Sequence, residues 1–299
     1  MAKLVQDASL TSVANAIREK TGGTNSLIFP DGFVSAIEGI TMGVAKEPYI
    51  EEIYDEQGYL INAMLHGYTK IRDHAFSNCT RLALTALPSE ITHIGNNAFY
   101  NCWGLILTEL PNRVTSIGME AFSGCTKLAL TALPSGVRSI DAGAFSDCTK
   151  LALTSLPSGL KSIDAQAFHG CTKLALTSLP NGITSIGQST FDSCTNLALT
   201  SLPSGVTSID DAAFQFCTKL ALTSLPSGIT SIGNRAFGNC TGLTSMIFEG
   251  TPTSIKSTAF NNCTNLTSIK VPWAEGAVAN APWGAKNATI TYNYTGEGE

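Results

Sequence analysis

The chain has few charged residues and no long apolar run. Charged side chains make up 14% of the 299 residues, against roughly 25% in ordinary soluble proteins. Serine, threonine and asparagine must therefore supply most of the polar surface. The net charge of −5 argues against a nucleic-acid partner, which needs a basic face. No apolar stretch approaches the ~18 residues that a membrane span requires.

Signals for export, metal binding and catalysis are also missing. The first residues lack the ~7–15-residue apolar stretch of a secretory signal, so we expect a chain made in the cytoplasm without a recognisable signal peptide. The nine cysteines form no Cys-x-x-Cys pair, which argues against zinc, and their odd number argues against a closed disulfide framework. The four histidines are scattered through the chain, and no Ser–His–Asp order or phosphate-binding glycine motif stands out. We therefore predict no enzyme activity and no cofactor.

The cysteines instead mark a strict repeat. A phenylalanine lies three residues before each of them, an isoleucine eight residues before and a leucine three residues after. No insertion breaks the register, which is the signature of a solenoid. The spacing is 23 residues throughout, with the cysteines at Cys79, Cys102, Cys125, Cys148, Cys171, Cys194, Cys217, Cys240 and Cys263.

One unit, residues 148–170, shows how a coil is expected to fold. Leu151 and Leu153 alternate with smaller residues, which predicts a strand, and Leu160 and Ile163 flank a second extended piece. Residues 164–168 read as one helical turn with Asp164 as its N-cap, and Asp141 and Asp210 share that position. We predict a right-handed leucine-rich-repeat solenoid, with short parallel strands and one helical turn in each 23-residue coil. The recurring cysteine is predicted to form a buried ladder rather than a row of reactive thiols.

A solenoid needs both ends covered. Residues 49–65 read as a hairpin that leads into the first coil, with Tyr59 and Ile61 in leucine positions. At the other end we expect a strand at 271–273, a short helix at 274–280 and a strand at 288–294, with Trp273 and Trp283 plugging the last coil. Stacking of carbohydrate on these two tryptophans is the alternative. Residues 1–43 lie outside the repeat and have the spacing of two short helices.

These features divide the chain into four parts. We predict a helical attachment segment at 1–45, a hairpin and N-terminal cap at 46–71, the solenoid at 72–270 and a C-terminal cap at 271–299. Two short helices bury little apolar surface by themselves. We therefore expect residues 1–45 to dock on a partner or on a second copy of the chain, which would make a homo-oligomer.

The repeat pattern A-F-x-x-C-T-x-L-x-L-T-x-L-P-x-x-[IV]-x-S-I resembles the BspA-type leucine-rich repeat over about residues 59–271. The resemblance implies a bacterial surface or virion-associated adhesion protein. Residues 10–22 and 29–40 also resemble the head segment of phage and prophage tail proteins of Gram-positive gut bacteria, and residues 271–290 resemble the same group. These likenesses imply a virion tail setting, with residues 1–45 binding other tail proteins.

Two kinds of surface residue are candidates for binding. Thr131, Thr154 and Thr177 belong to a file of outward threonines beside outward alanines. This flat, uncharged sheet is a docking face for glycan or protein, or it reflects only β-propensity and solubility; ice binding is a remote third interpretation. Lys127, Lys150, Lys173 and Lys219 share another outward position, which is either simply solvated or attracts an anionic wall polymer.

The second kind comprises departures from the repeat consensus, because exposed aromatics carry binding energy. They are Tyr100, Trp103 and Ile106 in the second coil and Phe216 in the seventh. For the second coil, a contact with the helices of residues 1–43 is the simpler explanation. We predict a non-enzymatic recognition or structural protein that contacts a bacterial surface glycan or protein, as a phage tail component. The alternative is a secreted or cell-surface adhesin or scaffold that binds host protein or glycan.

Overall fold

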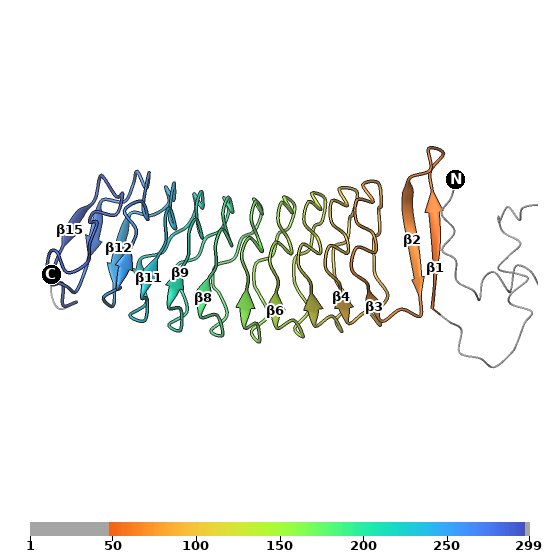
Figure 1. Ribbon diagram of the computed structural model, residues 1–299, viewed down its shortest axis with the longest axis horizontal. Coiled ribbons are helices and arrows are strands. Elements are labelled where there is room, and N and C mark those ends of the chain that lie inside the picture. The colour runs from red at the N-terminus through yellow and green to blue at the C-terminus, as the bar shows by residue number, and fades with distance from the viewer. Residues whose placement is uncertain (1–47, 297–299) are drawn as a thin grey trace, which may run out of the picture. The chain divides into compact units, whose positions relative to one another are not determined.

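The computed structural model describes residues 48–296, and these form a β-solenoid with nine coils of 23 residues. We number the coils from the one that contains Cys79 to the one that contains Cys263. Figure 1 shows successive coils side by side along one axis, from β3 to β15. The helical segment predicted for residues 1–45 lies outside the described residues.

The short strands lie in the Ser–Ile segments, one per coil. Each pairs in parallel with its equivalent 23 residues away, as Ile140 pairs with Ile163. Each isoleucine points inward and is buried. The parallel pairing places equivalent side chains above one another. These strands are β3 (Lys70–Ile71), β4 (His93–Ile94), β5 (Ser116–Ile117), β6 (Ser139–Ile140), β7 (Ser162–Ile163), β8 (Ser185–Ile186), β9 (Ser208–Ile209), β11 (Ser231–Ile232) and β13 (Ser254–Ile255).

The strand predicted at the Leu-x-Leu segments is wrong for most coils. In coil 4 this segment makes one backbone bond to the coil before, from Ala152 N to Leu130 O (3.0 Å), and Pro157 follows soon after and has no N–H to donate. Coil 8 has no such proline after its leucine segment. Regular parallel pairing joins the leucine segments of coils 7, 8 and 9 and the strand that follows them. The strands there are β10 (Ser224–Leu225), β12 (Ser245–Phe248), β14 (Ser268–Lys270) and β15 (Thr289–Thr291).

The predicted helical turn is also wrong, because residues 48–296 contain no helix. Two tight turns replace it, closed in coil 5 by Ala167 N to Asp164 O (3.2 Å) and Cys171 N to Phe168 O (3.1 Å). Gln166 and Gly170 have φ of 59° and 70°. A left-handed residue ends a right-handed helix, so no helical turn can propagate.

The predicted capping aspartates do not cap. Within the described part of the chain, the carboxylates of Asp141, Asp164 and Asp210 accept no backbone N–H of these turns. Where the position after the capping position carries Asp or Asn, its side chain accepts a backbone N–H from the next coil, as Asp211 Oδ1 does from Asn234 N (2.6 Å).

The core consists of identical side chains stacked from coil to coil. The phenylalanine rings from Phe76 to Phe260 form one continuous stack, with centroids 5.0–5.7 Å apart and planes within 5–9° of parallel. Offset stacking at this separation is favourable. The stack continues through coil 9, so every coil contributes to one core.

The cysteine ladder is confirmed in eight of the nine coils. From Cys102 to Cys263 each thiol is buried and donates to the carbonyl oxygen of the phenylalanine 26 residues earlier, as Cys171 Sγ does to Phe145 O (3.0 Å). Burial raises the pKa of these thiols, to about 12 for Cys102, so they stay protonated. Cys79 in the first coil is only half-buried.

The predicted N-terminal hairpin is confirmed. β1 (Tyr49–Tyr54) pairs antiparallel with β2 (Leu60–His66). The carbonyl of Ile61 accepts a bond from Ala83 N (2.9 Å), which is the bond that each Leu-x-Leu segment makes to the coil before it. Ile61 therefore occupies a leucine position, and the hairpin covers the open end of coil 1.

At the C-terminal end the two tryptophans close the core, as predicted. Trp273 and Trp283 are buried and both pack on Phe248, with ring centroids 5.3 and 6.0 Å away. β15 pairs in parallel with β14 at an offset of 21 residues, as Ser268 pairs with Thr289, and so adds a further turn to the stack that is two residues shorter than the repeat. The helix expected at 274–280 is absent, and turns occupy this segment. Because both rings are buried, they offer no platform for carbohydrate.

Candidate binding surface

The Leu-x-Leu segments form one side of the solenoid, which we call the leucine face. In coils 1–7 it runs from the second to the seventh residue after each cysteine. In coil 4, Leu151 and Leu153 are fully buried, whereas Ala152 is half-buried and Thr154 is exposed. The alternation therefore orients side chains as a strand would, even though regular pairing is missing.

The structure brings the predicted threonines together. Thr131, Thr154 and Thr177 occupy the same position in coils 3, 4 and 5, and all three are exposed. Within residues 48–296 their hydroxyl groups make no hydrogen bond to protein, unlike the threonines after each cysteine, one of which donates from Thr149 Oγ1 to Thr126 O (3.3 Å). The file thus presents free hydroxyl groups to a partner.

A file of lysines runs beside these threonines, two residues after the cysteine. Lys127, Lys150, Lys173 and Lys219 are all exposed. No ion pair involves any of them in the described residues; Lys219 Nζ donates to Asn196 Oδ1 (2.7 Å). Arg81 holds the same position in coil 1.

Coil 2 carries an apolar patch at the edge of this face, where Trp103 directly follows the cysteine. Trp103 and Ile106 are 54% and 40% exposed, where other coils have threonine and mostly alanine. Tyr100 is half-buried and lies on the turn before the cysteine, so it does not extend the patch. The predicted contact of coil 2 with residues 1–43 falls on undescribed residues and stays a prediction.

Phe216 combines exposure with a strained backbone. The residue before each cysteine has positive φ, and the other eight coils place Asn, Asp, Ser or Gly there. Phe216 has φ of 59° and is 41% exposed. A bulky residue in the left-handed region is an outlier that costs roughly 1–2 kcal/mol. Such strain persists mainly where a function requires the side chain, and the sequence pattern alone did not reveal it.

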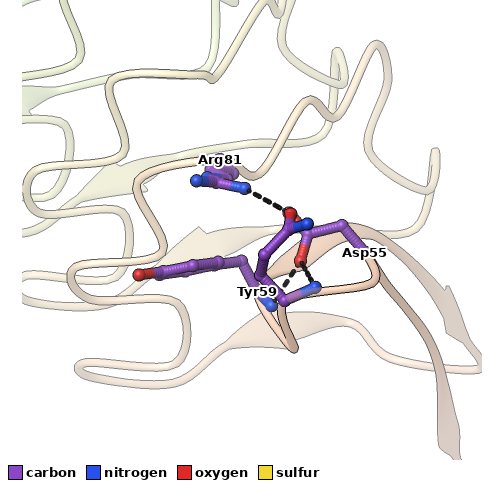
Figure 2. A network of polar contacts seen from close by, with 4 residues as sticks. Asp55, Tyr59 and Arg81 are labelled. Carbon is purple, nitrogen blue, oxygen red and sulfur yellow. Dashed lines mark hydrogen bonds and ion pairs between the residues drawn. The ribbon is translucent and has the colours of Figure 1, made fainter.

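A polar network that the sequence pattern does not predict joins the hairpin to the leucine face (Figure 2). Arg81 Nη1 contacts Asp55 Oδ2 at 2.6 Å and its guanidinium lies 4.1 Å from the centre of the Tyr59 ring. Asp55 Oδ1 accepts hydrogen bonds from the backbone of Tyr59 (2.8 Å) and Gln57 (3.1 Å). These bonds and Arg81 lower the pKa of Asp55. The one feature of the sequence that could have indicated this network is Arg81, which takes the position of the lysines in coil 1.

The opposite side of the coils offers a weaker candidate. An open hollow of about 570 Å³ lies over Gly95 and Gly118, beside β3–β5. Lys70 and Arg72 line it together with acidic Asp73 and Asp141, so it concentrates no charge of one sign. We therefore take the leucine face as the candidate surface.

Chemistry of other kinds has little support in the described residues. No cluster of three or more His, Cys, Asp or Glu could hold a metal ion in residues 48–296, and no helix in that range is long and apolar enough to cross a membrane. His169 Nδ1 lies 3.7 Å from Asp192 Oδ2, and burial raises the pKa of that carboxyl group. The Ser193 hydroxyl donates to Asp192 Oδ1 (3.0 Å), so it is bound to the acid and not to the imidazole, which is not the arrangement of a Ser–His–Asp set.

Comparison with known proteins identifies the repeat. The model of the BspA type leucine rich repeat region matches residues 62–175 and 161–275. A leucine-rich repeat protein from Bacteroides ovatus ATCC 8483 is 22% identical, with a TM-score of 0.53, over 83% of this chain and 76% of its own. No curated protein matches the chain.

Two further solved structures are looser likenesses. The T. pallidum leucine rich repeat protein is 25% identical, with a TM-score of 0.44, over 73% of this chain and 87% of its own. A leucine rich cell surface protein from Faecalibacterium prausnitzii A2-165 is 21% identical, with a TM-score of 0.29, over 85% and 97%. Of these three structures, the Bacteroides protein alone has a TM-score above 0.5, so it is the one that supports the fold. The predicted resemblance to phage tail proteins has no counterpart among these matches.

Proposed function

Since this chain belongs to the BspA-type leucine-rich repeat family, we propose that it is a non-enzymatic recognition protein that binds a surface glycan or protein through its leucine face and the turns at the cysteines that border this face. One observation carries the proposal. Phe216 keeps an exposed aromatic ring in a left-handed position, where most coils have a small or polar residue. Exposed aromatics concentrate binding energy, so a partner contact explains a residue that folding disfavours.

The remaining features of the face support this role. Trp103 and Ile106 add exposed apolar area in coil 2, and unbonded threonine hydroxyls lie between coil 2 and coil 7. Rigid aromatic anchors beside adaptable polar groups are the usual composition of a binding surface. The uniform core holds the coils in one register, so these side chains are presented at fixed intervals.

The experiment is a binding screen with the full chain against intact bacterial cells and arrays of glycans and surface proteins. Trp103→Thr and Phe216→Asn restore the residues that other coils carry, so both variants are expected to fold. Each should weaken binding by about tenfold, in the range of an interface hot spot. Met119→Ala is the matched control, because Met119 is 50% exposed but lies off the leucine face.

The outcomes separate the alternatives. Unchanged binding in both aromatic variants would overturn the proposal. If Trp103→Thr leaves binding intact but makes residues 1–47 more sensitive to protease, Trp103 contacts that segment, as the simpler interpretation of coil 2 predicts. Phe216 then remains as the test of the leucine face.

The setting of this binding is a second question. An outer surface, of a cell or of a virion, suits a recognition protein of this family. The likeness of residues 10–22, 29–40 and 271–290 to phage tail proteins is the support for the virion, with residues 1–45 docking on other tail proteins. The absence of tail or base-plate genes beside the gene would count against the virion and favour a cell-surface adhesin.

A further inference from the structure

Resting on the proposed function, we propose that the ligand is a linear acidic polysaccharide that lies along the lysine file, with one carboxylate-bearing sugar per coil. The file comprises Lys127, Lys150, Lys173 and Lys219 on the leucine face. Beside this file, Trp103 directly follows the cysteine of coil 2 and Phe216 directly precedes the cysteine of coil 7, so they lie one and three residues along the chain from the lysine position.

The charge of this face is opposite to that of the chain. The protein carries a net charge of −5, yet the leucine face of coils 1–7 holds Arg81 and the four lysines against a single acid, Glu109. No lysine of the file is paired with an acid in the described residues. Like charges on neighbouring coils repel one another, so an anion bound between them relieves that repulsion. Charge complementarity therefore selects an anionic ligand.

The spacing selects a linear ligand with a regular charge. Parallel strands lie about 4.8 Å apart, and the phenylalanine rings of coils 3, 4 and 5 are separated by 5.5 and 5.6 Å. A pyranose unit advances a linear sugar chain by about the length of one such step. The axial repeat of a linear polyuronate therefore matches the spacing of Lys127, Lys150 and Lys173.

The groups beside the file suit a sugar. Thr131, Thr154 and Thr177 present unbonded hydroxyls along it, which can exchange hydrogen bonds with ring hydroxyls. The exposed rings of Trp103 and Phe216 offer flat apolar surface for the faces of terminal sugars. Five coil steps separate these two aromatics, so the track is about 25 Å long and accommodates roughly five sugars.

A single row of cations favours this ligand over others. A duplex nucleic acid needs a broad basic patch, whereas this row is one side chain wide and sits on an acidic protein. A folded protein partner would bury apolar core area, whereas the middle of this face carries alanine, threonine and lysine.

The test measures binding of oligogalacturonates of increasing length to the full chain by calorimetry. The matched neutral probe is the same oligomer with its carboxyl groups reduced to alcohols. We expect affinity to rise with length up to roughly five sugars and then level off. The neutral probe should bind at least about tenfold more weakly, and added salt should weaken the acidic probe.

The decisive variant is Lys127→Gln/Lys150→Gln/Lys173→Gln, which keeps the side-chain length nearly unchanged at exposed positions. It should lower affinity for the acidic probe on the order of tenfold or more. The control is Lys161→Gln/Lys256→Gln, which removes two exposed lysines that lie off the file. An equal loss in the control would show general charge attraction and overturn the inference.

The two proposals fail differently. If cells or neutral glycans bind through Trp103 and Phe216 while the lysine variant changes nothing, the acidic ligand is wrong and the recognition function stands. Length-independent binding of the acidic probe would likewise overturn the track. If neither aromatic nor lysine variants alter binding of any probe or cell, both proposals fall.

Discussion

Replacing Phe168 with alanine tests whether the stacked core makes the coils one cooperative unit. Phe168 is fully buried in coil 5, and its ring lies 5.6 and 5.7 Å from those of Phe145 and Phe191. Truncation of a buried phenylalanine costs about 3–5 kcal/mol. Each lost ring pair contributes about 0.5–1.5 kcal/mol of that, and two pairs are lost here, so we expect a value near 5 kcal/mol.

The comparison variant is Phe76→Ala in coil 1. Phe76 is nearly as buried but stacks on one ring, that of Phe99 at 5.2 Å. Its cost should be lower by one ring pair, about 1 kcal/mol. Because coils couple to their neighbours, the Phe168 variant should also unfold in two steps as the coils on either side separate, whereas the Phe76 variant should fray from one end.

Urea unfolding followed by circular dichroism measures both effects, with Phe216→Ala as an exposed aromatic control. A loss below about 2 kcal/mol for Phe168→Ala would place it outside the range for buried rings and refute the stacked core. A cost for Phe76→Ala equal to that for Phe168→Ala would refute the contribution of the second ring pair.

Three further predictions concern titratable groups. In the native state a thiol reagent should label Cys79 alone, since burial protects the other eight thiols, and denaturant should expose all nine; rapid native labelling of more would contradict the ladder. The pKa of Tyr54 is about 12 because its hydroxyl donates to Glu52, so Glu52→Gln should shift its absorbance titration towards about 10; an unchanged midpoint would rule out that cause. The pKa of Asp55 is lowered, first by the Tyr59 amide and then by Arg81. The stabilisation of the turn is therefore present above the ordinary aspartate pKa and is lost as pH falls through the lower folded value. The Tyr59 amide shift in NMR should report this midpoint, and Arg81→Ala should raise it only in part; a full return to about 3.9 would show that Arg81 dominates.

The inward-facing half of the molecule was predictable from sequence. A 23-residue period with fixed Phe, Cys and Leu positions allows only one stacking register, so the ring stack, the thiol ladder and the tryptophan plug followed from polarity alone. The hairpin was equally clear, because alternating residues flank the turn before Tyr59. Periodicity predicts which side chains face inward, and the repeated Phe, Ile, Leu and Cys side chains, except that of the half-buried Cys79, are buried as it predicts.

The backbone between these positions was harder to predict. The left-handed turns depend on hydrogen bonds from one coil to the next, such as Gln166 N to Gln188 O (2.9 Å), which no local pattern encodes. Leucine and isoleucine segments both alternate, and the proline after the leucines decides which one pairs regularly. Arg81 in coil 1 contacts Asp55 in the turn of the hairpin, 26 residues earlier. The repeat pattern does not extend to that turn and so does not predict the contact.

Of the candidate binding surface, the sequence indicated which residues are unusual but not why. Trp103 and Phe216 stand out equally as departures from consensus. The backbone angle of Phe216 separates them, because only coordinates show that this ring sits where most side chains are disfavoured. Composition likewise does not show that the hydroxyl groups of Thr131, Thr154 and Thr177 make no hydrogen bond to the described part of the protein.

The bond from each thiol to the carbonyl one coil earlier has a consequence for how such a chain can change in length. Any whole unit can be duplicated or deleted between the hairpin and the tryptophans, and the new junction makes the same bond as every other. Gene recombination between near-identical units could therefore extend or shorten the outer face in steps of a single coil while leaving both end covers untouched.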